Sequence, residues 1–191
     1  MEGVHGFGRE AERCGRDSMI RVVVTGSECT GKTTLARALA EVYRCVHVPE
    51  FVREFVVRKG TPPEPADVGV IARGQLALED SLVSSARNVV VLDTDLVSTF
   101  VYSQHYFGSC PDWIDEMVNV KRADLYVVAG IDVPWTADGA QRDRGHMRGA
   151  MHELFRSELL RRGFPFIEVE GSKRERLVAS MAAIEPLLAA R

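Results

Sequence analysis

One stretch of eight residues restricts the possible folds of this chain more than any other feature. Residues 26–33 read GSECTGKT, which fits the pattern GxxxxGK[ST] of a phosphate-binding loop. The β-branched, apolar run at 20–25 is typical of a buried parallel strand, and the apolar residues within 32–43 recur at helical spacing. The motif requires a strand, a glycine-rich turn and a helix in this order, so we expect a phosphate cradle here.

The chemistry of such a loop follows from its backbone. Glycines let successive amide N–H groups turn inward around phosphate oxygens, and the start of the following helix adds partial positive charge. Lys32 is expected to bridge the β- and γ-phosphates of ATP, and the Thr33 hydroxyl to bind Mg²⁺. The nucleotide-binding residues predicted from the motif are Gly26, Ser27, Glu28, Cys29, Thr30, Gly31, Lys32, Thr33 and Thr34.

Length and composition limit the class of protein. The 191 residues, 46% hydrophobic and 27% charged, are typical of one globular domain that buries a full core. We expect this domain over residues 19–191 and a disordered extension, rich in Gly, Arg and Glu, over residues 1–18. The formal net charge is −3, with basic and acidic residues interspersed, so no broad cationic face for nucleic acid is predicted.

Two further patterns bear on the cellular compartment. The four cysteines form no CxxC pair and show no zinc-ligand spacing, which indicates separate, reduced thiols in a cytoplasmic protein. No run approaches the roughly 20 apolar residues that a membrane-spanning helix needs. We therefore expect no membrane partner, and the sequence makes no prediction about the oligomeric state.

The rest of the chain continues the alternation of strand and helix. Parallel neighbours need crossover connections, so this order predicts an α/β fold: a five-stranded parallel sheet with helices on both faces, a three-layer P-loop kinase-like sandwich. The polar segment 131–149 is expected to form a loop or lid. The expected strands are 20–25, 45–48, 88–92, 124–129 and 166–169, and the expected helices are 32–43, 51–59, 66–86, 95–106, 112–121, 150–162 and from 173 onward.

Acidic residues follow two of the expected strands, at the sheet edge where open α/β sheets bind ligands. P-loop proteins place a carboxylate that holds Mg²⁺ or contacts the nucleophile at the position of Asp93. The alternative role of Asp93 is an N-cap of the next helix, which Thr94 or Asp95, the second candidate carboxylate, could provide instead. Glu50, Asp93 and Asp95 are all candidates to accept the proton of an acceptor hydroxyl, and the sequence does not choose among them. Arg53 is a candidate partner for Glu50 or for a phosphate, although the spacing of Glu50 and Arg53 is equally typical of a surface ion pair.

Three other groups of side chains allow two interpretations each. Trp135 would stack on a flat, cationic ring or anchor the core. Of the arginines in and after the lid segment, one or two are expected to neutralise charge in the transition state, and the alternative is a solvated surface; these are Arg142, Arg144 and Arg148. Gln75 and Glu79, one helical turn apart, are expected to face water rather than a pocket.

Four later segments, together with the phosphate loop, carry a family resemblance. They are residues 48–55 (VPEFVREF), 93–96 (DTDL), 123–126 (ADLY) and 132–139 (DVPWTADG). Across about residues 20–190 the chain resembles the ribosylnicotinamide kinase domain of the bifunctional NMN adenylyltransferase/ribosylnicotinamide kinase family, within the P-loop NTPase superfamily. The DVPW segment is the most discriminating of the four.

The resemblance implies ATP-dependent phosphorylation of the 5′-hydroxyl of nicotinamide riboside, a step of NAD salvage that yields nicotinamide mononucleotide. It implies that ATP-Mg²⁺ is held by Lys32 and Thr33 and that Asp93 assists the metal or the nucleophile. The riboside would contact Glu50, Arg53, Asp95, Trp135, which covers the nicotinamide ring, and Asp138, at the sugar or lid. The residues expected to take part in catalysis are Lys32, Asp93, Glu50 and Arg142.

The chain also departs from the family pattern. The 18-residue extension is too short for an adenylyltransferase domain, so adenylyl transfer is not expected. Cys29 replaces a more usual serine, Phe51 replaces a tyrosine, and Arg142 is displaced by one residue in the lid. Two other functions remain open: another nucleoside or small-metabolite kinase, and a nucleotide-sensing module that binds without turnover.

Overall fold

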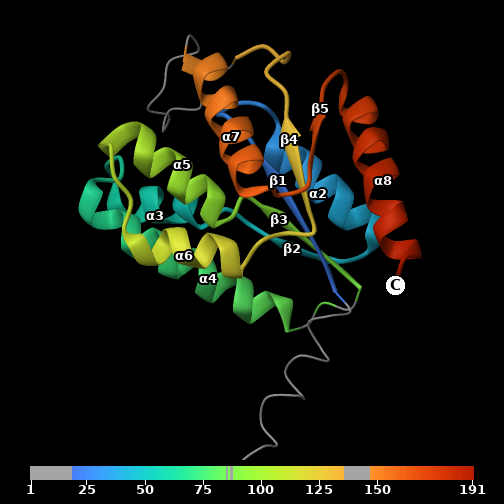
Figure 1. The fold of residues 1–191 in the computed structure, drawn as a ribbon, viewed down its shortest axis with the longest axis horizontal. Helices are drawn as coiled ribbons and strands as arrows, with labels where there is room; N and C mark the ends of the chain where they lie inside the picture. The colour runs from blue at the N-terminus through green and yellow to red at the C-terminus, as the bar shows by residue number, and fades with distance from the viewer. Residues whose placement is uncertain (1–18, 85, 87, 136–146) are drawn as a thin grey trace, which may run out of the picture.

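The computed structural model describes residues 19–84, 86, 88–135 and 147–191. All pairings between its strands are parallel, and the order across the sheet is β2-β3-β1-β4-β5 (Figure 1). The strands are β1 (Ile20–Thr25), β2 (Val46–Val48), β3 (Val89–Asp93), β4 (Leu125–Ala129) and β5 (Phe166–Val169). The five-stranded parallel sheet expected from the sequence is confirmed.

Helices cover both faces of this sheet, as expected. The helices α2 (Lys32–Tyr43) and α8 (Lys173–Ala189) pack on one face. The other face is covered by α4 (Val68–Val83), α5 (Leu96–Phe107), α6 (Asp112–Val120) and α7 (Arg148–Arg162), and α3 (Phe51–Lys59) packs on α4. None of the described helices is long and apolar enough to span a membrane.

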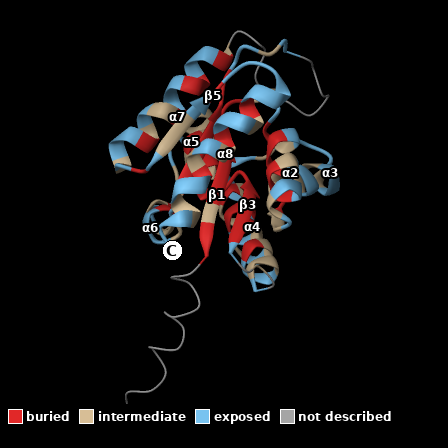
Figure 2. Ribbon diagram, turned by 90° about the vertical axis from the view of Figure 1, so that its right-hand side faces the viewer, coloured by how far each residue is buried: buried red, intermediate tan, exposed pale blue. Residues whose placement is uncertain are grey.

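Burial on both faces explains why the central strands read as continuous apolar runs. Every residue of β3 and β4 is buried, and the strands form the buried centre in Figure 2. Side chains alternate along a strand. Val22 of β1 accordingly joins the core under α2 and α8, whereas the next residue, Val23, joins the core under α4, α5 and α7.

Most element boundaries agree with the sequence analysis within a few residues. The expected helix 66–86 is shorter: a 3₁₀ turn, η1 (Pro65–Asp67), precedes α4, and α4 ends at Val83. A capping box between Glu64 and Asp67 sets this start, because each accepts a hydrogen bond from the other's backbone N–H. The extension 1–18 and residues 136–146 of the expected lid lie outside the described residues.

Candidate active site

The phosphate loop joins β1 to α2 through three residues with left-handed backbone conformation: Gly26 (φ 124°), Cys29 (φ 54°) and Gly31 (φ 83°). A side chain on Gly26 would meet the carbonyl oxygen of Ala129 at 3.0 Å, so only glycine lets the loop lie against the end of β4. The helix α2 starts at Lys32, and its first N–H groups lack intrahelical acceptors. This arrangement suits an anion.

Lys32 lies inside the curve of the loop. Its Nζ donates to the carbonyl oxygen of Ser27 at 2.7 Å, and the Thr30 hydroxyl donates to the same oxygen at 2.9 Å. Only 6% of Lys32 is exposed, and this burial lowers the pKa of its ammonium, whereas the nearby charges of Glu50 and Asp93 oppose the shift. A buried ammonium on the loop is suited to a multiply charged phosphate group.

Arg176 of α8 holds the loop from its outer side. It is buried, and its guanidinium donates to the carbonyl oxygens of Thr30 at 2.8 Å and Gly130 at 3.2 Å while pairing with Asp132. Partial burial of Asp132 acts to raise the pKa of its carboxyl group. The Gly171 N–H and the Arg176 guanidinium outweigh it and hold that pKa below its usual range. The last helix thereby ties the phosphate loop to the segment after β4.

Arg148 makes a second, weaker connection to the loop. This buried residue starts α7, and its guanidinium donates to the carbonyl oxygen of Val133 at 2.9 Å and to that of Cys29 at 3.5 Å. Of the three arginines considered in the sequence analysis, Arg148 is thus placed against the loop. Arg142, Arg144 and the sugar candidate Asp138 lie outside the described residues, so their predicted roles stay predictions.

Two buried oxygens, one on the loop and one at the end of β3, have the chemistry of magnesium ligands. Asp93 ends β3, where its Cα pairs with Val24 of β1, and only 1% of the residue is exposed. In the described part of the chain, neither Asp93 Oδ1 nor the Thr33 hydroxyl has a hydrogen-bond partner. Buried polar atoms are rarely left without partners, and hard oxygen donors are the ligands that Mg²⁺ prefers.

Asp95 lies two residues beyond Asp93 but in a different environment. It is the N-cap of α5: Oδ1 accepts from the Val97 N–H at 2.9 Å, and Oδ2 accepts from the Tyr126 hydroxyl at 3.0 Å. Burial raises the pKa of Asp95 to about 7, and the nearby charge of Glu79 adds to the shift despite the two hydrogen bonds. The capping alternative weighed for Asp93 is taken by Asp95.

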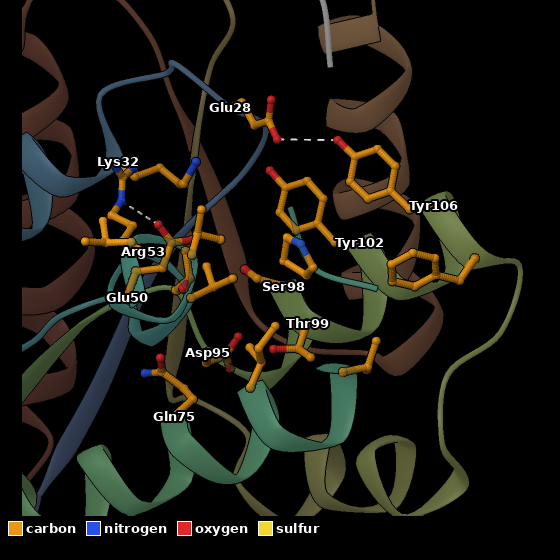
Figure 3. Close-up of a pocket in the computed structure, with 18 of the residues that line it drawn as sticks. Glu28, Lys32, Glu50, Arg53, Gln75, Asp95, Ser98, Thr99, Tyr102 and Tyr106 are labelled. Atoms are coloured by element: carbon orange, nitrogen blue, oxygen red, sulfur yellow. Dashed lines mark hydrogen bonds and ion pairs between the residues drawn. The ribbon is translucent and has the colours of Figure 1, made fainter. Parts of the chain in front are cut away.

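Glu50 and Arg53 form an ion pair on the wall of a cavity. Arg53 Nε lies 2.7 Å from Glu50 Oε2, so the pair expected from the spacing is present, and both residues line the cavity. Glu50 occupies the N-cap position of α3 but makes no capping bond; Gln75 Oε1 instead accepts from the Phe51 N–H at 2.9 Å. The Glu50 carboxylate thus remains directed at the cavity (Figure 3).

The expectation that Gln75 and Glu79 face water was wrong. Only 3% of Gln75 and 1% of Glu79 is exposed. Gln75 lines the cavity and caps α3, whereas Glu79 pairs with Arg21 of β1 at 3.0 Å. Burial raises the pKa of Glu79, although Arg21 opposes the shift. The helix α4 therefore turns its polar pair toward the sheet and the cavity.

The cavity joins the phosphate loop to an aromatic wall. Its volume is about 430 Å³, and Figure 3 shows Lys32, Glu50 and Arg53 on one side and Tyr102 and Tyr106 of α5 on the other. Apolar side chains of α3 and α4 complete it: Val52, Val56, Val57, Val68 and Ile71. A phosphate cradle beside a largely apolar cavity can bring a phosphate donor and a hydroxyl-bearing acceptor together.

Trp135 lies elsewhere. It follows β4, on the other side of β1 from β2 and β3, and it is 39% exposed. The cavity is lined by Glu28, Glu50, Arg53 and Asp95, among other described residues, but not by Trp135. Its predicted place over a ring therefore stays a prediction.

Curated relatives match part of this chain. Over 122 residues it is 30% identical to the trifunctional NAD biosynthesis/regulator protein NadR of Salmonella typhimurium strain LT2, and equally to NadR of Escherichia coli strain K12. The match covers 62% of this chain but only 30% of the length of each relative.

Solved structures share the fold. The crystal structure of NadR protein in complex with NAD and AMP-PNP has a TM-score of 0.78 at 23% identity, covering 92% of this chain and 51% of that one. The structure of NadR protein in complex with NR has a TM-score of 0.72 at 24% identity, covering 83% and 46%. Thymidylate kinase from Candida albicans has a TM-score of 0.65 at 12% identity, covering 88% and 92%. At these identities the likeness shows a P-loop kinase-like fold.

A family model spans the fold and most of the site. The model for an AAA domain matches residues 21–176, from β1 and the phosphate loop to Arg176 on α8. On this match the chain belongs to the AAA domain family.

Proposed function

We propose that this chain is an ATP-dependent kinase that phosphorylates the 5′-hydroxyl of nicotinamide riboside and yields nicotinamide mononucleotide. The observation that carries the proposal is the single cavity in which the phosphate-loop Lys32 faces Glu50 and the tyrosines of α5. Two comparisons support the acceptor: the relatives named for NAD biosynthesis, and the similarly folded NadR protein in complex with NR.

The donor half of the reaction uses the loop and its two buried oxygens. Backbone amides after Gly26 and the Lys32 ammonium would hold the phosphates of ATP. The Thr33 hydroxyl and Asp93 would hold Mg²⁺, which supplies neutralisation of phosphate charge when bound. The similarly folded NadR protein in complex with AMP-PNP supports ATP as the co-substrate.

The acceptor half uses the carboxylates on the cavity wall. Glu50 would accept the proton of the 5′-hydroxyl, and Arg53, paired with it, would approach the transferred phosphate. A wall of tyrosine rings and carboxylates suits a cationic pyridinium ring. The roles expected for Asp95, Trp135, Asp138 and Arg142 at the riboside and in the lid belong to the same proposal. A cytoplasmic location would agree with the free thiols of Cys45 and Cys110.

The test is mass detection of nicotinamide mononucleotide after the protein is incubated with Mg²⁺-ATP and nicotinamide riboside. We expect product from the wild type and from Lys173→Ala, which changes an exposed lysine of α8. We expect none from Lys32→Ala, which should keep the far-UV circular dichroism of the wild type.

Three results would contradict the proposal in different ways. Product from a deoxynucleoside but none from nicotinamide riboside would make the acceptor wrong. Tight ATP binding without product from any riboside would favour the sensing module over the kinase. Normal turnover by Lys32→Ala would remove the catalytic role of the phosphate loop.

A further inference from the structure

Glu28 places a negatively charged side chain at a position of the phosphate loop that the motif leaves open. It is the third residue of the motif, and backbone amides, not side-chain oxygens, form the cradle. A carboxylate accepts hydrogen bonds but donates none when ionised, and it repels phosphate oxygens. Glu28 therefore needs a task other than holding phosphate.

The structure directs Glu28 away from the cradle and into the acceptor cavity. Its side chain lines that cavity and extends toward α5, where the Tyr106 hydroxyl lies 3.4 Å from Glu28 Oε1 (Figure 3). The Tyr106 ring is stacked on Tyr102, with ring centroids 6.0 Å apart and planes 8° from parallel. Tyr106 is thus held in place, and it holds the Glu28 carboxylate across the top of the cavity.

The position of Glu28 on the loop indicates which part of an acceptor it meets. In-line transfer requires the reacting hydroxyl to lie beside the γ-phosphate, hence beside the loop. In a riboside that reacts through its 5′-hydroxyl, the sugar ring lies next to the reacting hydroxyl, and the base lies beyond the sugar. A side chain that leaves the loop and lines the cavity therefore meets the sugar before the base.

The chemistry of the carboxylate agrees with this position. Sugar hydroxyls are donors, and a carboxylate has about four lone-pair sites, so it can accept hydrogen bonds from several donors at once. Two other carboxylates line the same cavity farther along the chain: Glu50 accepts from Arg53, and Asp95 accepts from Val97 and Tyr126. Burial lowers the pKa of the Lys32 ammonium, and the nearby charge of Glu28 is one of those that oppose this shift, so Lys32 partly balances the negative charge of Glu28.

We infer that Glu28 recognises the sugar of the acceptor: its carboxylate, positioned by Tyr106, accepts hydrogen bonds from the 2′- or 3′-hydroxyl and selects ribosides over deoxyribosides. The inference rests on the proposed function and adds to it a residue that determines specificity. The phosphate loop would then have two roles: its backbone binds the phosphate donor, and the Glu28 side chain recognises the acceptor.

The experiment compares kcat/KM for nicotinamide riboside with kcat/KM for its 2′-deoxy and 3′-deoxy analogues. The wild type should favour the riboside over at least one analogue by about tenfold or more, the usual effect of losing a hydrogen bond to a charged group. In Glu28→Gln this preference should fall severalfold, because a neutral amide replaces the carboxylate. Tyr106→Phe should reduce it partly, as expected of a positioning residue.

Because the preference is a ratio within one protein, any effect of a variant on ATP cancels. The matched control is Glu54→Gln, which makes the same chemical change on the exposed face of α3, and it should keep the wild-type preference. An unchanged preference in Glu28→Gln, or no preference in the wild type, would overturn the inference alone. A wild type that does not phosphorylate nicotinamide riboside would overturn the proposed function and the inference together.

Discussion

The perturbed carboxylate of Asp95 gives a quantitative prediction for Asp95→Asn. Burial raises the folded-state pKa from 3.8 to about 7. At about 1.4 kcal/mol per pKa unit, the ionised form is disfavoured in the folded protein by about 4 kcal/mol. Asparagine has a similar shape, can cap α5 through its Oδ1, and carries no charge at any of these pH values.

The sign of the pH effect follows from the direction of the shift. Below pH 3.8 both states keep the proton, and the group has no effect on stability. Between 3.8 and about 7 the unfolded chain ionises while the folded protein stays protonated, so the free energy of unfolding falls as pH rises. Above about 7 the loss is complete, and the wild type has lost stability that Asp95→Asn retains.

Urea unfolding of both proteins between about pH 5 and pH 8 tests this reasoning. The free energy of unfolding of Asp95→Asn minus that of the wild type should rise by about 2.5 kcal/mol over this range. Other titrating groups contribute to both curves and largely cancel in the difference. A difference that does not change with pH would refute the raised pKa.

Two further predictions concern neighbouring residues. Asp93→Asn should lower kcat for riboside phosphorylation by about 10²-fold or more and weaken the dependence of the rate on Mg²⁺, because one of the two oxygens assigned to the ion loses its charge. A magnesium titration of the reaction rate measures both effects. A magnesium profile like that of the wild type would contradict the assignment. Gln75→Ala should lower the free energy of unfolding by about 1–3 kcal/mol, because the hydrogen bond from the Phe51 N–H and buried side-chain volume are lost. It should also raise KM for the riboside, because the start of α3, where Glu50 lies, is no longer held in place. Urea unfolding and riboside kinetics test the two effects, and unchanged values in both would remove Gln75 from the site.

The sheet and the phosphate loop could be predicted from sequence because their signals are local. The apolar runs at 20–25 and 88–92, and the glycines of 26–33, describe a strand, a strand end and a turn within a few residues. Glu50 and Asp95 could also be placed at the cavity, because the carboxyl ends of parallel strands meet at one edge.

Features that depend on distant contacts could not be predicted in this way. The spacing of Gln75 and Glu79 indicates that they share a helix face but not what that face contacts, so the expectation of a solvated pair was wrong. The environment of Asp95 depends on Tyr126, 31 residues away in the chain. Arg176 donates to the Thr30 carbonyl oxygen from 146 residues away in the chain, and no local sequence pattern indicates this hydrogen bond.

That long-range support has a consequence for protein synthesis. A nascent chain that has emerged from the ribosome as far as residue 170 contains the whole phosphate loop and four connected crossovers of the sheet, but Arg176 is not yet available to hold the Thr30 carbonyl or to pair with Asp132. The loop is therefore synthesised well before the residue that holds it in place. Firm nucleotide binding should appear only when α8 has docked, so that the ability to hold ATP reports that the sheet and its final helix are assembled.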